Sequence, residues 1–342
     1  MRRWVALFPL VALASTRDAG LWPDCSVEEV HSDGPFKEFT QLNVTQNETL
    51  MFVSHPELSK GPLPVMVFSH GATGEYAMYE AAIRRYVSHG FVVIFPHIKD
   101  AQQDTSPFTL DPMGGFTMKG FYYAHFANSD VNSPLQQKLD LGNLALVGHS
   151  MGATATLMAA AKLPEGSAKV AVSQHPGVCG PYGPPPCLPG SCNTWMPHDL
   201  ETVSQRIPFL LTTATNDGAF WPAPYTAEHE LGCFNSPFQN PEAKNATAFA
   251  QFSGSACEDD GKGGRYDRKW SNGGHDCPMK TQSPETPWVL TAVKLYTQLG
   301  GSASSKCHSM LWGSGADSLQ KDSNIEKFVI HSPADVQDSL LV

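Results

Sequence analysis

Short runs of apolar residues recur along the middle of the chain without the polar alternation of a half-exposed strand. The runs are residues 64–69, 91–95, 144–147, 169–173 and 208–213. Strands buried on both faces have this pattern, because neither side meets water. Segments with helical spacing separate or follow the runs, at residues 75–88, 118–128, 151–163 and 287–299. This succession predicts an α/β protein with a mostly parallel central sheet and helices on both of its faces.

The segments on either side of this pattern have a different character. Residues 42–45 and 49–53 alternate in polarity around a short turn, which predicts an antiparallel hairpin. We therefore expect an N-terminal segment over 15–34 and one folded domain over 35–300. Residues 301–342 are rich in Gly and Ser with little periodicity, and we expect them to form a loosely attached C-terminal tail.

The first residues have the composition of a targeting segment. Two arginines precede an apolar run over residues 4–13, and Ala12 and Ala14 form a small-residue cleavage site. We expect residues 1–14 to be a signal peptide and the protein to be secreted, with import into an organelle as the alternative use of such a leader. An ordinary N-terminal strand is the competing interpretation. The run falls short of the ~20 residues that cross a bilayer, and no later segment is apolar enough, so we expect no transmembrane segment.

Eight cysteines follow the leader. They are Cys25, Cys179, Cys187, Cys192, Cys233, Cys257, Cys277 and Cys307. An even number of cysteines in a secreted chain favours disulfides. N-glycosylation sequons begin at Asn43, Asn47 and Asn245, and we expect them to accept glycans in a eukaryotic secretory route. Zinc binding is the alternative use of cysteine, but no C-x2-C pair occurs and no histidine pair has ligand spacing, so we expect no metal.

Composition and charge exclude several classes of protein and partner. The 342 residues include 23 Lys and Arg against 33 Asp and Glu, a net charge of −10, and 41% of them are hydrophobic. A chain this apolar can bury a core, which excludes a disordered, highly charged protein. An acidic chain has no electrostatic attraction to the phosphates of nucleic acids. We expect a monomer that binds no nucleic acid.

The sharpest chemical signal is Gly148-His149-Ser150-Met151-Gly152, which lies between a buried strand and an Ala-rich helix. A G-x-S-x-G at such a junction is a nucleophile elbow. The turn is tight, so glycines on both sides of the serine avoid collisions with neighbouring backbone. Ser150 is thereby placed at the N-terminus of a helix, where the helix dipole favours developing negative charge. Ser150 is the candidate nucleophile.

A serine nucleophile needs a carboxylate that orients its histidine base, and the acid comes between Ser and His in the chain order of this elbow type. Asp217 directly follows the apolar run 208–213, where we expect the carboxyl end of a strand. An ordinary Asn-Asp-Gly turn is the alternative interpretation. Other acids before the last helix, such as Glu201, Glu228 and Glu230, follow no buried strand. Asp217 is therefore the candidate acid.

The candidate base is His275, in a glycine-rich loop shortly before the last helix, where an imidazole can reach the elbow. His229 and His308 are the alternatives, although the first follows Asp217 closely and the second lies in the tail. His149 is expected to pack inside the elbow and to take no part in the chemistry.

The tetrahedral intermediate of acyl transfer needs two backbone amides that hold its oxyanion. We expect one from Met151, the residue after the nucleophile. The other should come from the loop after the first buried run, where Ala72 is the first choice and Thr73 the next. A structural role is expected for the side chain of His70, ahead of a catalytic one.

These features together resemble the α/β-hydrolase superfamily, and within it the group of polyester (PET) hydrolases, cutinases and chlorophyllases. The matching segments are residues 65–74, 88–93, 133–135, 139–140, 148–153, 216–217 and 273–277. The resemblance implies that Ser150, Asp217 and His275 are the catalytic triad, with Ala72 and Met151 at the oxyanion hole. A triad mechanism of this kind needs no cofactor.

Two departures from that group affect the substrate more than the reaction. Asp217 and His275 are 58 residues apart, farther than in bacterial polyester hydrolases. Some of those enzymes have a cysteine beside the catalytic acid, where this chain has Ala214, so Cys277 must pair elsewhere. The second departure is a proline-rich insertion with three cysteines over residues 179–195.

Lipases with a helical cap carry it near this insertion, whose prolines and cysteines favour a stapled loop instead. We therefore expect no helical lid and an open apolar groove, with Tyr76 and Trp221 as candidate walls and Thr73 at its edge. The resemblance adds Trp195 to that wall. Ordinary core packing is the alternative for each aromatic residue. Such a groove suits hydrophobic or bulky ester substrates.

We therefore predict a secreted serine carboxylic ester hydrolase. A platelet-activating-factor acetylhydrolase-like phospholipase is the alternative within the enzyme class, because it shares the G-H-S-x-G elbow. A noncatalytic binding protein with the hydrolase fold is the alternative from a different class. It would have lost a triad member, and this chain retains a candidate for each.

Overall fold

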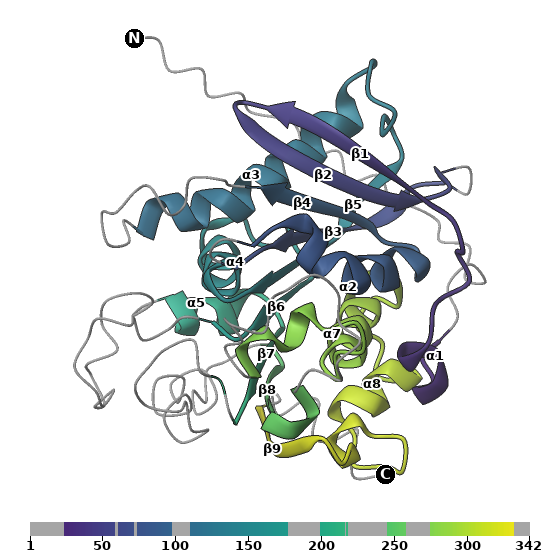
Figure 1. Ribbon diagram of the computed structural model, residues 1–342, viewed down its shortest axis with the longest axis vertical. Coiled ribbons are helices and arrows are strands. Elements are labelled where there is room, and N and C mark those ends of the chain that lie inside the picture. The colour runs from purple at the N-terminus through teal and green to yellow at the C-terminus, as the bar shows by residue number, and fades with distance from the viewer. Residues whose placement is uncertain are drawn as a thin grey trace.

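A mixed sheet runs through the centre of the molecule (Figure 1). The computed structural model describes residues 24–58, 61–71, 74–97, 110–176, 199–215, 217, 245–257 and 274–331. Within these residues the sheet has nine strands in the order β1-β2-β4-β3-β5-β6-β7-β8-β9. Their bounds are β1 Phe39–Gln46, β2 Thr49–Pro56, β3 Leu63–Ser69, β4 Val92–His97, β5 Leu139–His149, β6 Val170–Gln174, β7 Phe209–Ala214, β8 Thr247–Phe252 and β9 Ile325–His331.

The strands from β4 to β8 are parallel, as the buried apolar runs predicted. The predicted antiparallel hairpin is confirmed as β1 and β2, which pair from Phe39 opposite Pro56 to Gln46 opposite Thr49. Asn47 and Glu48 form its turn with φ of 47° and 66°, the left-handed conformation of tight hairpins. Strand β8 is an additional strand that the sequence patterns did not identify.

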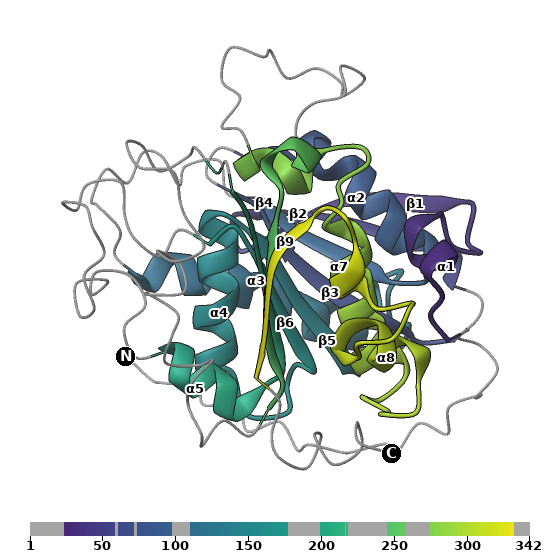
Figure 2. The ribbon, with the colours of Figure 1, turned by 90° about the horizontal axis from the view of Figure 1, so that it is seen from below.

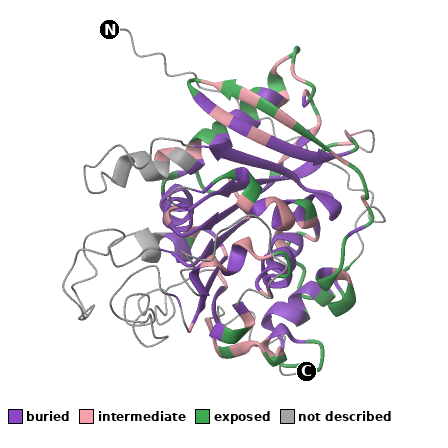
Figure 3. Ribbon diagram, in the orientation of Figure 1, coloured by how far each residue is buried: buried purple, intermediate pink, exposed green. Residues whose placement is uncertain are grey.

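Helices cover both faces of the sheet (Figure 2). One face carries α3 (Leu110–Ser129), α4 (Met151–Lys162) and α5 (Asp199–Arg206). The other carries α1 (Val27–His31), α2 (Tyr76–Ser88), α7 (Thr286–Val293) and α8 (Lys306–Trp312). The central strands are buried on both sides by these layers, whereas β1 at the sheet edge is partly exposed (Figure 3). This two-sided burial explains why the parallel strands are continuously apolar.

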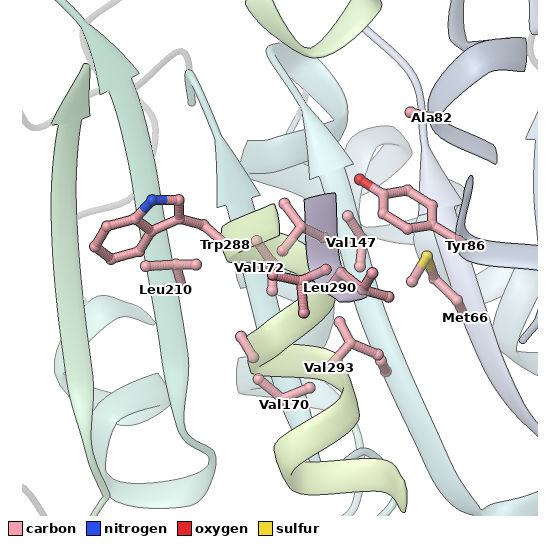
Figure 4. Close-up of a cluster of buried hydrophobic side chains, with 14 of the residues drawn as sticks. Met66, Ala82, Tyr86, Val147, Val170, Val172, Leu210, Trp288, Leu290 and Val293 are labelled. Carbon is pink, nitrogen blue, oxygen red and sulfur yellow. The ribbon is translucent and has the colours of Figure 1, made fainter. Parts of the chain in front are cut away.

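Helix α7 forms the middle of one apolar core. Its Trp288, Leu290 and Val293 lie against Val147 and Val172 of the parallel strands (Figure 4). The helix continues into a π-helical turn, Lys294–Gln298. This packing fixes the segment immediately before α7 against the sheet, and that segment belongs to the site described below.

We expected residues 301–342 to form a loosely attached tail, but within the described part, residues 301–331, they pack as an integral part of the fold. Cys307 in α8 is bonded to Cys25, so α8 is linked covalently to the N-terminal segment before α1. Strand β9 then completes the sheet by pairing antiparallel with β8. Helix α8 buries Met310 and Leu311 in the core around α7. These short elements have too few residues for their periodicity to stand out in the sequence.

None of the helices in the described ranges is both long enough and apolar enough to cross a membrane. The leader over residues 1–14 lies outside the described residues.

Candidate active site

Ser150 occupies the turn between β5 and α4. Its φ of 55° and ψ of −120° are strained for a residue with a side chain. The glycines on each side make the turn possible: a Cβ on Gly148 would lie 2.2 Å from the carbonyl oxygen of Gly152, and one on Gly152 would lie 2.1 Å from that of Ser69. The geometry is that of a nucleophile elbow.

The structure brings Ser150, His275 and Asp217 together in hydrogen-bonding order. The Ser150 hydroxyl faces Nε2 of His275 at 2.9 Å, and Nδ1 of His275 faces Oδ2 of Asp217 at 3.0 Å. All three side chains are buried. Burial by itself raises the pKa of Asp217, but the charge of His275 and hydrogen bonds from both neighbouring histidines outweigh it and hold the pKa below its ordinary value. Asp217 is therefore the ionised acceptor of this chain of contacts.

His275 lies on the 3-10 helix Gly274–Met279, and a disulfide fixes that segment. Cys277 is bonded to Cys257, at the end of the short helix that follows β8. This is the alternative partner that Cys277 required. The bond ties the loop of His275 to the sheet.

His149 links three segments of the site. Its Nδ1 accepts from the hydroxyl of Tyr79 at 2.8 Å, and its Nε2 donates to the carbonyl oxygen of His275 at 2.7 Å. The Tyr79 oxygen in turn accepts from the backbone N–H of Gly71 at 2.9 Å. Burial lowers the pKa of His149 well below its ordinary value, and the charges of His275 and His175 act in the same direction. His149 is thus neutral, with its proton on Nε2.

The loop after β3 is described only in part, and Ala72 and Thr73 lie outside the described residues. His70 begins it, with Nδ1 donating to the carbonyl oxygen of Gly71 at 2.6 Å and its ring stacked on Phe95 at 5.3 Å. Burial lowers the pKa of His70 to about 4, and this neutral, packed side chain fits a structural role. Met151, the other expected oxyanion residue, begins α4 and is half-buried.

The aromatic residues expected at the groove wall divide into two sets. Tyr76 is buried: its hydroxyl lies 2.8 Å from that of Ser54, and its ring stacks on Phe52 at 5.0 Å. It packs between α2 and the sheet, which is the alternative that we named for each aromatic. Trp195 and Trp221 lie outside the described residues.

Two buried residues that the sequence reasoning missed stand behind Asp217. Nδ1 of His175 lies 2.8 Å from Oδ2 of Asp217, and its Nε2 lies 2.5 Å from Oε1 of Glu285. His175 directly follows β6, as Asp217 follows β7, so both lie at the carboxyl ends of adjacent parallel strands. That shared position was a signal for His175. Glu285 precedes α7 and carried no comparable signal.

Several groups could in principle hold a metal ion. Within the described part of the chain, three sets of His, Cys, Asp and Glu bring donor atoms within 4.8 Å of one another. Two sets contain cysteines that are already joined as disulfides. The third is His175, Asp217 and His275, in which a ring nitrogen of each histidine already faces Asp217. Hydrogen bonding accounts for this arrangement without an ion.

The parallel sheet, its helical layers and the strand–elbow–helix turn at Ser150 define the α/β-hydrolase fold, which is also the fold of the family whose model matches part of the chain. Residues 25–178 match the model of the chlorophyllase family. The match indicates a hydrolase that acts on esters. It includes Ser150 and His175 and ends before Asp217 and His275. No curated protein sequence matches the chain.

Proposed function

We propose that the protein is a serine carboxylic ester hydrolase with Ser150 as nucleophile, His275 as general base and Asp217 as the acid that orients it. The observation that supports this most strongly is the continuous row of contacts from the Ser150 hydroxyl through His275 to Asp217, at 2.9 Å and 3.0 Å. A nucleophile, its base and the group that orients the base within hydrogen-bond reach is the arrangement of acyl-transfer enzymes.

The reaction proceeds in two acyl-transfer steps. His275 takes the Ser150 proton as Oγ attacks the ester carbonyl, and the imidazolium then gives this proton to the departing alcohol oxygen. Water attacks the acyl-enzyme by the same route and releases the acid. Asp217 accepts from Nδ1 of His275 throughout, which keeps Nε2 aimed at the serine. Backbone amides of Met151 and Ala72 hold the oxyanion.

The substrate in this proposal is an ester with a bulky apolar group. The chlorophyllase match supports esters of long apolar alcohols such as phytol, and a net charge of −10 disfavours anionic substrates. Thr73, Trp195 and Trp221 remain the candidate substrate contacts. Cutin-like polyesters are the finer alternative suggested by sequence. A platelet-activating-factor acetylhydrolase-like activity is the second candidate, favoured only by the G-H-S-x-G elbow.

We further propose that the protein is secreted as a monomer without its leader. Two buried disulfides support an oxidising compartment. Asn43 and Asn47 are exposed on the hairpin, where glycans fit. Asn245 is partly buried and its amide nitrogen donates to the carbonyl oxygen of Ser204 at 3.2 Å, so it is the poorest of the three acceptors.

The test is covalent labelling with a fluorophosphonate, located by peptide mass spectrometry, beside turnover of short-chain, phytyl, polyester and choline-phospholipid esters. We expect label on Ser150, and Ser150→Ala should lose labelling and at least about 10³-fold in kcat while keeping the same Tm. Absence of label in a folded sample would favour the noncatalytic binding protein. Preferential turnover of the phospholipid would favour the acetylhydrolase alternative.

A further inference from the structure

A buried row of charged groups continues the candidate triad beyond Asp217. Oδ2 of Asp217 is shared by two imidazoles, His275 at 3.0 Å and His175 at 2.8 Å. The far nitrogen of His175 then meets Oε1 of Glu285. His175 and Glu285 have no exposed surface. A simple triad ends at its acid, whereas this row continues for two more ionisable groups.

The contacts of His175 define its protonation state. A neutral imidazole has one N–H, so one of its two nitrogens would turn a lone pair toward a carboxylate oxygen. Both nitrogens of His175 face carboxylates, and only the imidazolium can donate to both. Burial opposes this charge, but Glu285 and Asp217 outweigh it and raise the pKa of His175 to about 10.

The surroundings of Glu285 match a carboxylate. Its Oε2 accepts from Nε2 of Gln174 at 2.8 Å and from the hydroxyl of Thr212 at 2.7 Å, while Oε1 accepts from His175. Three donors compensate a buried negative charge. Tyr86 also interacts electrostatically with Glu285, and burial raises the pKa of Tyr86, so its phenol stays neutral.

The backbone holds His175 in place at the end of β6. Its φ of 51° lies in the left-handed region, and its N–H donates to the carbonyl oxygen of Thr212 at 2.7 Å. A non-glycine residue in this conformation persists only where its surroundings determine it. Here the conformation directs the ring between two carboxylates, one from the segment after β7 and one from the segment before α7.

We propose that His175 and Glu285 are positioning residues that complete a relay of five residues, Ser150–His275–Asp217–His175–Glu285. This inference rests on the proposed function of Ser150, Asp217 and His275 and extends it. His175 orients the Asp217 carboxylate and offsets its negative charge, and Glu285 holds His175 in its charged form. The positive charge of His175 thereby offsets part of the attraction of Asp217 for the imidazolium that His275 forms during the reaction.

His175 takes no part in the proton transfer of the relay. During acylation one proton moves from Ser150 to Nε2 of His275 and then to the alcohol oxygen, while His175 keeps both of its protons. Besides Ser150 and Asp217, His275 is faced by the rings of His149 at 4.9 Å and His175 at 5.5 Å. His149 is neutral, so His175 is the nearby cation that acts on His275.

The pH dependence of kcat/KM with a p-nitrophenyl acyl ester tests the relay. In His175→Gln, the cation is lost while one N–H donor can remain. We expect the acid limb to move upward by about one pH unit, because Asp217 then acts on His275 without an opposing charge. We expect kcat to fall by up to about 100-fold through loss of orientation, with KM within about twofold of wild type.

Glu285→Gln is the second variant, because it keeps the side-chain shape and tests the relay independently if His175→Gln fails to fold. Its acid limb should move in the same direction, because His175 loses the carboxylate that holds it in its charged form. The movement should be smaller, because Asp217 still faces His175. The matched control is His125→Gln, at an exposed position on α3, and its profile should equal that of wild type. A role in packing alone would lower Tm in both relay variants without moving the acid limb.

The outcomes separate the two proposals. Wild-type enzyme that labels at Ser150 and turns over, with unmoved acid limbs in folded Glu285→Gln and His175→Gln, overturns the relay and leaves the proposed function standing. Wild-type enzyme that neither labels nor turns over overturns both. Acid limbs that move in the order His175→Gln, then Glu285→Gln, then no movement for His125→Gln support the relay.

Discussion

Two fully buried histidines flank His275, and they carry different charges. His149 lies on the side of the nucleophile elbow, with its ring 4.9 Å from that of His275. His175 lies on the side of Asp217, at 5.5 Å. Burial disfavours the charged form of both. The partners decide the outcome: a hydroxyl and a carbonyl oxygen face His149, whereas two carboxylates face His175.

This difference separates two tasks within one site. The neutral histidine joins backbone segments, because it connects Tyr79 and the loop of Gly71 to the carbonyl oxygen of His275. The charged histidine acts on the electrostatics of Asp217. Substitutions at the two positions should therefore affect different quantities, stability on one side and the pH dependence of the reaction on the other.

The largest effect is expected at the group that His275 and His175 share. Asp217→Asn removes the carboxylate that orients the Nδ1 proton of His275, and we expect kcat to fall by roughly 10³- to 10⁴-fold. The measurement is steady-state turnover beside the rate of fluorophosphonate labelling. Asp130→Asn, outside the site in a turn after α3, is the control. A fall of less than tenfold would show that Asp217 does not orient the base.

His149→Phe should reverse the pattern of His175→Gln. The ring fits a similar space, but the Tyr79 hydroxyl and the carbonyl oxygen of His275 each lose a buried partner. We expect the free energy of unfolding to fall by about 2–3 kcal/mol. The acid limb of kcat/KM should stay in place, since no charge is removed. Urea unfolding and the pH–rate profile measure the two quantities, and an acid limb that moves as far as in His175→Gln would contradict the distinction.

The same contrast shows which parts of the molecule could be predicted from sequence. Local sequence rules were enough to predict the tight turn at Ser150. The elbow is one contiguous motif, and backbone contacts at Gly148 and Gly152 require its glycines. The parallel strands were equally accessible, since burial on both faces leaves continuous apolar runs. The strands β8 and β9 were not predicted, because they are short and have no distinct sequence pattern.

The proposed relay could not be predicted from local sequence patterns, because its residues come from distant parts of the chain. His175 and Glu285 are 110 residues apart and meet only after α7 packs on the sheet. Without that packing, His175 is one of 13 histidines and Glu285 one acid before a helix. The charge of His175 is less accessible still, since it depends on which atoms face each ring nitrogen.

The smallest effect concerns stability as a function of pH, and its sign differs for the two histidines. The pKa of His175 is raised to about 10 from 6.5, so its contribution to stability is complete below pH 6.5 and is lost as the pH rises toward 10. The pKa of His149 is lowered, so its contribution is complete above pH 6.5 and is lost as the pH falls. Asp217, with its lowered pKa, adds to the loss only below its ordinary value of 3.8.

Wild-type stability should therefore decline on both sides of pH 6.5. His175→Gln should flatten the alkaline decline, whereas His149→Phe should lessen the acid decline without abolishing it, because the lowered pKa of His70 contributes to the same loss. Chemical unfolding at closely spaced pH values from about 4 to about 10 measures both slopes. An alkaline slope that persists in His175→Gln would mean that His175 is not the buried cation. An acid slope that is undiminished in His149→Phe would assign the acid loss to other groups such as His70, because an aromatic ring without a titrating nitrogen cannot gain a proton.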